Sequence, residues 1–377
     1  MSSVINLNSH TFREINNQPQ MWSDTYRVVL EKQEEIKSFL SRYYNEDVTI
    51  IFTGAGTSSF IGNILQFMMY KFNITNYKSV ATTDITTHAE AIFNKNKKYI
   101  LVSLARSGNS PESIAAVDLA DSICGHNIAH VFVTCNSEGK LAKKPSKENI
   151  LILVLPSATN DKGLAMTSSF TSMLLTALLI FDIDHIEARE PDIDLLCKKT
   201  QYMLNKYLTP IEQIASLDFE RAVFLGSGEL KGIAEECHLK LQELTDGNVI
   251  CLFDSFLGFR HGPKAVLNEK TLLVYLFSDN EKVFQYERDL VYQINNGQVK
   301  PVAQIYVSQS MKHFNNLAFQ LEMIPEKSEK SAYDVLLFVL IGQLLGLFKS
   351  YYFNLDPDNP SMNGKITRVV EGVIIYQ

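Results

Sequence analysis

The chain has 377 residues, of which 46% are apolar and 20% charged; this composition is ordinary for a folded globular protein, and the length exceeds what one hydrophobic core usually serves. Its formal net charge is -7, and no segment has the dense cluster of basic residues that binding to nucleic acid requires. Backbone amides and hydroxyl groups can still hold a small phosphate. We therefore expect two domains and no nucleic-acid partner.

Five cysteines are scattered along the chain, and none has the paired spacing of a zinc site. We interpret them as reduced thiols of a cytoplasmic protein, and we expect no metal and no cofactor. The N-terminal segment lacks the basic start and apolar run of a secretory signal. The longest apolar run, 335–348, contains Gln343 and is too short to cross a bilayer, so it predicts a buried helix and no membrane partner.

The spacing of apolar residues predicts the elements in chain order. Residues 1–47 show a polar helical pattern with one apolar face and predict an N-terminal helical extension. Strands are predicted at 48–54, 78–83, 99–104, 129–134 and 150–155, and helices at 60–72, 112–124, 138–143 and 168–181. After connecting helices in 182–220, strands are predicted at 221–225, 248–253, 271–277 and 302–307, and helices at 230–244, 282–295 and 333–352.

Two similar segments occupy the same place in each half of the chain: FTGAGTSS at 52–59 and FLGSGELK at 224–231. Each follows an apolar strand and leads into a helix, and such alternation predicts parallel sheets covered on both faces. The fold class is therefore α/β, with two tandem doubly wound domains at 48–200 and 201–377 behind the extension 1–47. A dinucleotide site is disfavoured, because Ser59 and Lys231 stand where the third glycine of its fingerprint belongs.

The segment SLARSGNSPES (103–113) joins a strand to a helix and carries several hydroxyl groups. Ser107, Asn109 and Ser110 form a small turn in which hydroxyls and helix amides converge, as they would around a phosphate. Helix capping by Ser110 is the alternative, but it explains only one of the serines. Thr57 and Ser58, in the turn of the neighbouring strand, are expected to face the same crevice.

In the helix predicted at 230–244, Glu236, Lys240 and Glu243 fall on one stripe. Such charges usually form surface ion pairs, but this helix follows a glycine turn at the carboxyl end of a strand, where open α/β sheets bind ligands. A functional carboxylate is therefore favoured. The loop RHGPK (260–264) adds His261, and histidine is the residue type whose proton moves near neutral pH, although a histidine there could also merely hold the loop.

Taken together, these motifs resemble the SIS (sugar isomerase) domains of sugar-phosphate aldose/ketose isomerases over about 48–377. The resemblance is strongest to the AgaS-type group, described as galactosamine-6-phosphate deaminases or tagatose-6-phosphate ketose/aldose isomerases. It rests on ARSGNSPES, GSGELKGIAEE, ECHLKLQEL, TDGN, FRHGPK and the terminal RVVEGVIIY. In the related glucosamine-6-phosphate synthase the turn reads SQSGET, so Ala105 here replaces one phosphate-binding serine while Arg106 adds a cation.

The resemblance implies roles for individual residues. Those expected to hold the sugar phosphate are Thr57, Ser58, Arg106, Ser107, Asn109 and Ser110, with Glu236 also near the substrate. His261 would open the sugar ring, Glu243 would move a proton between C2 and C1, and Lys240 would stabilise anionic charge or set the ionisation of Glu243. Lys365 loosely matches a tail lysine that lies near the sugar carbon in the synthase.

Without an amidotransferase domain to deliver ammonia, the degradative direction is favoured: galactosamine 6-phosphate to tagatose 6-phosphate and ammonia. A plain aldose/ketose isomerase of a hexose 6-phosphate is the first alternative. A non-catalytic sugar-phosphate sensor is the second, but a sensor would need neither Glu243 nor His261.

Related isomerases work as dimers in which this histidine reaches the neighbour's active site. Apolar Phe256, Leu257 and Phe259 precede His261, and an exposed apolar loop is natural at an interface. We therefore expect a homodimer, or a higher homo-oligomer, whose active site is shared between chains. The alternative is a loop folded back on its own domain.

Overall fold

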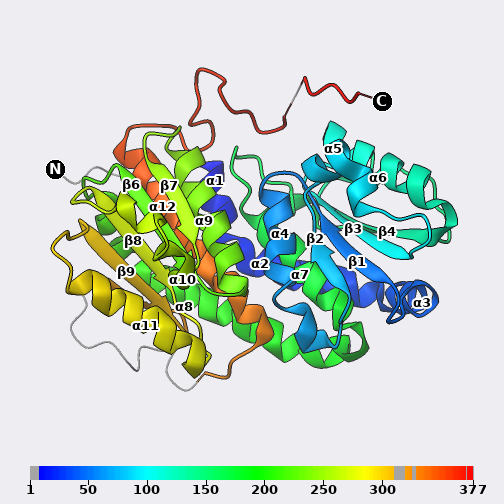
Figure 1. Ribbon diagram of the computed structural model, residues 1–377, viewed down its shortest axis with the longest axis horizontal. Coiled ribbons are helices and arrows are strands. Elements are labelled where there is room, and N and C mark those ends of the chain that lie inside the picture. Colours follow the sequence, from blue (N-terminus) through cyan, green and yellow to red (C-terminus); the bar gives the residue numbers. More distant parts are fainter. Residues whose placement is uncertain (1–7, 310–318, 325–327, 371, 377) are drawn as a thin grey trace. The chain divides into compact units, whose positions relative to one another are not determined.

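The computed structural model describes residues 8–309, 319–324, 328–370 and 372–376. They form two compact units, each built on a five-stranded parallel sheet (Figure 1). We call the first the β1 unit; it comprises 20–161, 166–194 and the described residues from Thr367 onward. The second, the β6 unit, comprises 162–165, 195–366 and the described residues up to Pro19. The two α/β units, with helices at the N-terminus, confirm the predicted fold class.

The sheet of the β1 unit is covered by helices on both faces. In sheet order its strands are β2 (Tyr77–Ser79), β1 (Thr49–Thr53), β3 (Tyr99–Ala105), β4 (Ile128–Thr134) and β5 (Ile150–Val154). One face packs on α5 (Thr82–Ile92) and α6 (Pro111–Cys124), and the other on α4 (Thr57–Leu65) and α7 (Ser168–Phe181). Every residue of β3 is buried, which explains why this strand is apolar almost throughout.

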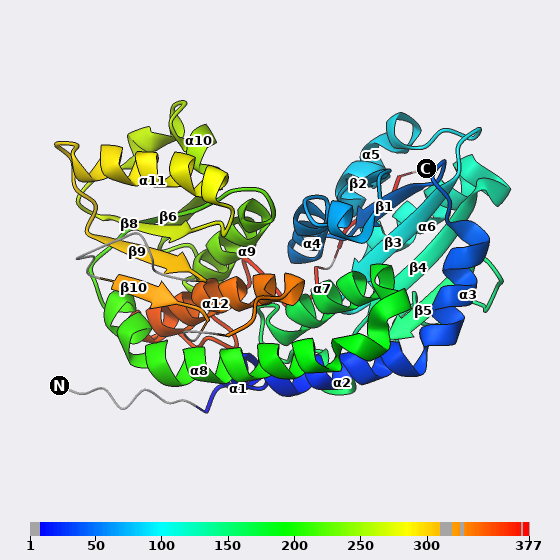
Figure 2. The ribbon, with the colours of Figure 1, turned by 90° about the horizontal axis from the view of Figure 1, so that it is seen from below.

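In the β6 unit the sheet order is β10 (Phe319–Glu322), β9 (Ala303–Ser308), β8 (Thr271–Leu276), β6 (Arg221–Gly226) and β7 (Ile250–Asp254). Figure 2 shows α10 (Phe256–Phe259) and α11 (Glu281–Asn295) on one side of this sheet, and α12 (Val335–Tyr352) on the other. Helix α9 (Glu229–Leu244) packs closely against α12. Their contact requires Gly342, because a Cβ there would lie 2.4 Å from the Cα of Cys237.

Between residue 8, where the described chain begins, and β1 lie three helices: α1 (His10–Asn16), α2 (Gln18–Glu31) and α3 (Gln33–Tyr43). The predicted connection between the halves is the 3-10 helix Ile183–Arg189 followed by α8 (Glu190–Ala215). These helices confirm the helical character predicted for both segments.

Every predicted strand overlaps an observed strand, but the strand predicted at 78–83 and the helix predicted at 138–143 differ from the structure, and two observed elements were not predicted. The strand predicted at 78–83 ends at Ser79, because α5, which was not predicted, begins at Thr82. The helix predicted at 138–143 is a series of turns. Its backbone packs on the turn after β3, where Lys140 N–H donates to Asn109 Oδ1 (3.0 Å) and Leu141 N–H to Gly108 O (3.2 Å). The short strand β10 was also not predicted.

The long apolar helix near the C-terminus is a core element. The stretch Ala332–Tyr352 is long and apolar enough to cross a membrane, but 94% of its apolar window is buried inside the structure. Two of its polar residues make internal hydrogen bonds, since Gln18 Nε2 donates to Gln343 Oε1 (2.8 Å) and Lys349 Nζ to Leu217 O (2.7 Å). This confirms the buried helix predicted from the sequence.

Candidate functional site

Two strand-to-helix turns of the β1 unit lie at the same edge of its sheet. Strands β1 and β3 are parallel neighbours, and each leads through a turn into the N-terminus of a helix, α4 or α6. Both turns depend on glycine, because Gly56 and Gly108 have φ values of 53° and 63°. The amides of two helix N-termini therefore converge at this edge, which is a favourable place for an anion.

A pocket of about 110 Å³ opens at this edge. Four of the predicted phosphate-binding residues line it: Ser58, Arg106, Ser107 and Ser110. Arg106 is nearly buried, and its guanidinium donates to the carbonyl oxygen of Arg368. The pocket thus combines hydroxyl groups, helix N-termini and a desolvated cation, a combination suited to a phosphate.

Two other predicted residues support the turns and do not line the pocket. Thr57 is buried in the first turn of α4. Asn109 accepts a hydrogen bond from Lys140 N–H through Oδ1, and its own N–H donates to Ser107 Oγ (3.2 Å). The structure places them beside the predicted site, where they shape its backbone.

The C-terminal segment of the β1 unit completes the pocket, and sequence reasoning missed it. Residues Arg368, Val369 and Val370 line the pocket together with Glu112. The guanidinium of Arg368 donates to Asn160 Oδ1 (2.8 Å) and, through Nε, to Asp161 O (2.7 Å). The only signal in the sequence was the terminal RVVEGVIIY motif, which supported the family resemblance but assigned no role.

Helix α9 of the β6 unit brings Glu236, Lys240 and Glu243 together as their spacing predicts. Lys240 Nζ lies 2.7 Å from Glu243 Oε2 and 3.5 Å from Glu236 Oε1. The side chains of Lys240 and Glu236 are at most 1% exposed, whereas that of Glu243 is 24% exposed. Glu243 is therefore the solvent-accessible carboxylate of this cluster, whereas Glu236 is enclosed.

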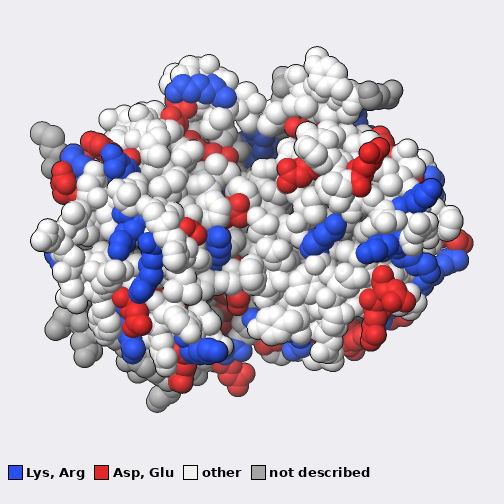
Figure 3. All heavy atoms as spheres, in the orientation of Figure 1, with Lys and Arg blue, Asp and Glu red and all other residues white. Residues whose placement is uncertain are grey.

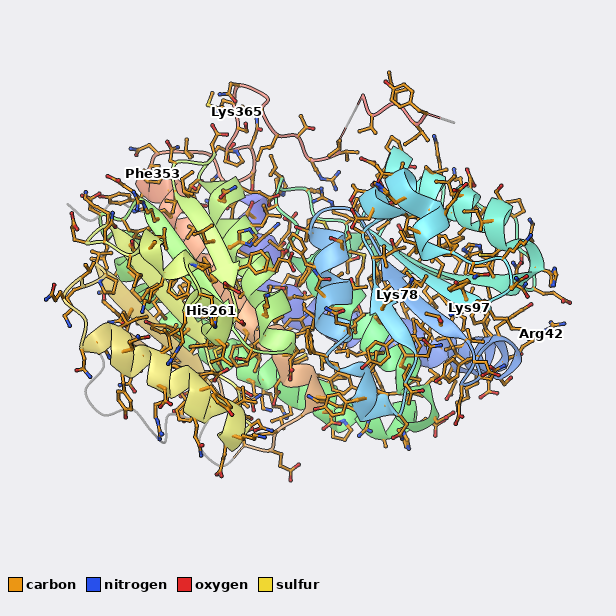
Figure 4. The ribbon with its side chains drawn as sticks, in the orientation of Figure 1. Arg42, Lys78, Lys97, His261, Phe353 and Lys365 are labelled. Atoms are coloured by element: carbon orange, nitrogen blue, oxygen red, sulfur yellow. The ribbon has the colours of Figure 1, made fainter. Side chains whose placement is uncertain are left out.

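The loop after α10 is only partly the exposed apolar loop that the sequence suggests. His261 is exposed in this loop (Figure 4), and Leu257 is 48% exposed. Phe256 and Phe259, however, are fully buried and belong to the core of their own unit. The interface argument from these two phenylalanines is therefore wrong, because both pack beside Tyr275.

Lys365 lies in the segment after α12 (Figure 4), and its ammonium group is 3.2 Å from Asp246 Oδ2. Both residues belong to the β6 unit, and the lysine side chain is largely exposed.

On the face drawn in Figure 3, lysine and arginine side chains are interspersed with aspartate and glutamate.

Comparison with known proteins shows which family the chain resembles. Residues 42–182 match the family model described as SIS domain. The chain is 35% identical to the D-galactosamine-6-phosphate deaminase AgaS of Shewanella sp. (strain ANA-3), over 97% of this chain and 91% of that protein. It is 32% identical to the D-galactosamine-6-phosphate deaminase AgaS of Escherichia coli, over 97% of this chain and 95% of the relative.

Solved structures give the same result. The tagatose-6-phosphate ketose/aldose isomerase from Escherichia coli superposes with a TM-score of 0.90 at 30% identity, covering 100% of this chain and 99% of that one. The glucosamine-6-phosphate deaminase from Thermotoga maritima shares the fold, with a TM-score of 0.73 at 21% identity over 96% of this chain and 99% of the other. Since the likeness to AgaS proteins extends over nearly the whole chain, the protein belongs to the AgaS family of SIS-domain proteins.

Proposed function

We propose that the protein is an isomerising deaminase that converts galactosamine 6-phosphate to tagatose 6-phosphate and ammonia. The observation that carries the proposal is the anion pocket lined by Ser58, Arg106, Ser107 and Ser110, in a chain that matches AgaS deaminases over 97% of its length. The partly exposed Glu243 beside Lys240 supplies a base. A sensor would not need that base, which favours an enzyme.

The proposed reaction transfers a proton from C2 to C1 of the open-chain sugar, and a second proton from the amino group to O1. His261 assists the opening of the ring to the C1 aldehyde. Glu243 then removes the proton from C2 while O1 takes up a proton that the C2 ammonium group gives up, which yields an enolamine; Glu243 returns its proton to C1, which yields an iminium ion at C2. Water adds to C2 and ammonia leaves, so that the ketose phosphate is formed with atoms and charge balanced.

Lys240 has a supporting role in this proposal. Its ammonium group contacts Glu243 at 2.7 Å and is itself neutralised by the enclosed Glu236. This contact fixes the position of the Glu243 carboxylate, which accepts the C2 proton. The same cation can stabilise negative charge that develops on the enolamine.

We also propose a homodimer in which His261 of one subunit serves the site that contains Glu243 of the other. Support comes from the exposure of His261 and from exposed apolar side chains in the same part of the β6 unit. Ile250 and Leu252 on the edge strand β7 are 57% and 39% exposed, and Leu257 lies in α10. The burial of Phe256 and Phe259 favours the alternative of a loop serving its own subunit.

Incubation with galactosamine 6-phosphate and with glucosamine 6-phosphate, followed by assays of ammonia and ketose phosphate, tests the proposal. Ammonia released together with tagatose 6-phosphate supports the deaminase. Interconversion of a hexose 6-phosphate with its ketose, without any ammonia from the amino sugars, would favour the plain isomerase. Binding without turnover would favour the sensor. The variant Glu243→Gln tests the proposed base. Its matched control is Glu235→Gln, because Glu235 lies on α9 outside the stripe of Glu236, Lys240 and Glu243.

A further inference from the structure

Glu112, in the first turn of α6, is the acid among the residues that line the anion pocket. This carboxylate would repel a negatively charged ligand, although Arg106 and the serine hydroxyls of the same lining suit one. Its Oε2 is buried and makes no hydrogen bond to any residue that the structure describes. A buried carboxylate oxygen without a donor costs free energy, so a donor supplied by the ligand would explain this placement.

Interaction with the helix dipole is the alternative explanation. An acid in the first turn of a helix is stabilising, and Glu281 holds such a position in α11. Glu281 is exposed, so an acid can interact with the helix dipole without lying in a pocket. It therefore does not explain why Glu112 Oε2 is buried next to an anion pocket.

The chemistry of a hexose 6-phosphate offers a suitable donor close to the phosphate. In the pyranose ring O5 is an ether oxygen, which only accepts hydrogen bonds. When the ring opens, O5 gains a proton and becomes a hydroxyl on the carbon next to the one that carries the phosphate ester. An ionised carboxylate accepts hydrogen bonds and donates none, so it complements the O5 hydroxyl of the open chain and not the ring ether.

We infer that Glu112 is a positioning residue that accepts a hydrogen bond from the O5 hydroxyl and so favours the open-chain form of the sugar phosphate. This inference rests on the proposed function, because it requires the phosphate to lie in the pocket with Ser107 and Ser110. The open chain is the form from which the C2 proton is removed. Glu112 thus acts on the reaction through substrate conformation and takes no part in proton transfer.

The test compares three ligands for the wild-type protein and for Glu112→Gln, by calorimetry. Galactitol 6-phosphate is linear and has the C5 hydroxyl, 1,5-anhydrogalactitol 6-phosphate keeps the ring ether, and inorganic phosphate has neither. We expect Glu112→Gln to weaken binding of the linear ligand by about tenfold, because a charge-assisted hydrogen bond becomes a neutral one. Binding of the ring ligand and of phosphate should stay the same or tighten, because a repelling charge is removed.

Glu281→Gln is the control, since it removes an acid from the first turn of a helix without touching the pocket. If Glu112→Gln folds poorly, Glu112→Asp provides the second variant, and it should retain part of the preference for the linear ligand. Equal weakening of all three ligands, or no weakening of the linear one, would overturn the role of Glu112. Failure of the wild-type protein to bind any of them would instead overturn the proposed function, and the inference with it.

Discussion

Glu287 on α11 gives the protein a stability that depends on pH. Its side chain is fully buried, Ser278 N–H donates to its Oε2 (2.9 Å), and the hydroxyl of Ser227 is a second partner. Burial raises the pKa of Glu287 to about 7, with a smaller contribution from Glu229, and the two donors only partly offset the effect. The ionised form is thus disfavoured in the folded state.

The direction of the pKa change decides whether the free energy of unfolding rises or falls with pH. The pKa of Glu287 is raised from the ordinary value of 4.5 to about 7, so the folded chain binds the proton more tightly than the unfolded chain does. The corresponding stability is fully present below about pH 4.5 and is lost as pH rises through about 7. Since each tenfold change in proton affinity corresponds to about 1.4 kcal/mol, ionised Glu287 costs the folded state roughly 3 kcal/mol above pH 7.

Glu287→Gln keeps the shape and the acceptor for Ser278 but removes the titration. Scanning calorimetry of both proteins between pH 5 and 8.5 should show the variant gaining unfolding temperature over the wild type as pH rises. The gain should level off above about pH 8. Glu281→Gln, an exposed acid of the same helix, should show no such trend. A difference between Glu287→Gln and wild type that is constant over this range would refute the reasoning.

Three further predictions concern activity. Replacing both Ser107 and Ser110 with Ala should raise KM for the sugar phosphate by at least tenfold in steady-state assays, since hydrogen bonds to a charged group contribute roughly 1.5 to 3 kcal/mol each. An unchanged KM would show that the phosphate does not bind in this pocket. Glu243→Gln should lower kcat by a factor of about 10² to 10⁴ while substrate still binds. Near-normal turnover would show that another residue is the base. Refolding a mixture of inactive Glu243→Gln and inactive His261→Asn chains should restore part of the activity if the site is shared; mixed dimers without activity would exclude sharing.

The sequence by itself determined the alternation of strands and helices, because local periodicity reports the burial of each element. The all-buried β3 and the stripe Glu236, Lys240, Glu243 on α9 could be predicted in this way. The glycine turns before α4 and α6 also carried a local signal, since a positive φ favours glycine. The pocket residues Ser58, Ser107 and Ser110 could be predicted from these turns, whereas Arg106 was found through the family resemblance.

Only the tertiary structure decided which charged residues are accessible and which distant segments meet. The burial of Glu236 could not be predicted, because burial on α9 depends on tertiary packing, and α9 packs on elements far away in the sequence such as α12. Arg368 reaches the pocket beside Arg106 although 262 residues separate them. Local propensity carries no information about such contacts, because they depend on the path of the chain through the folded unit.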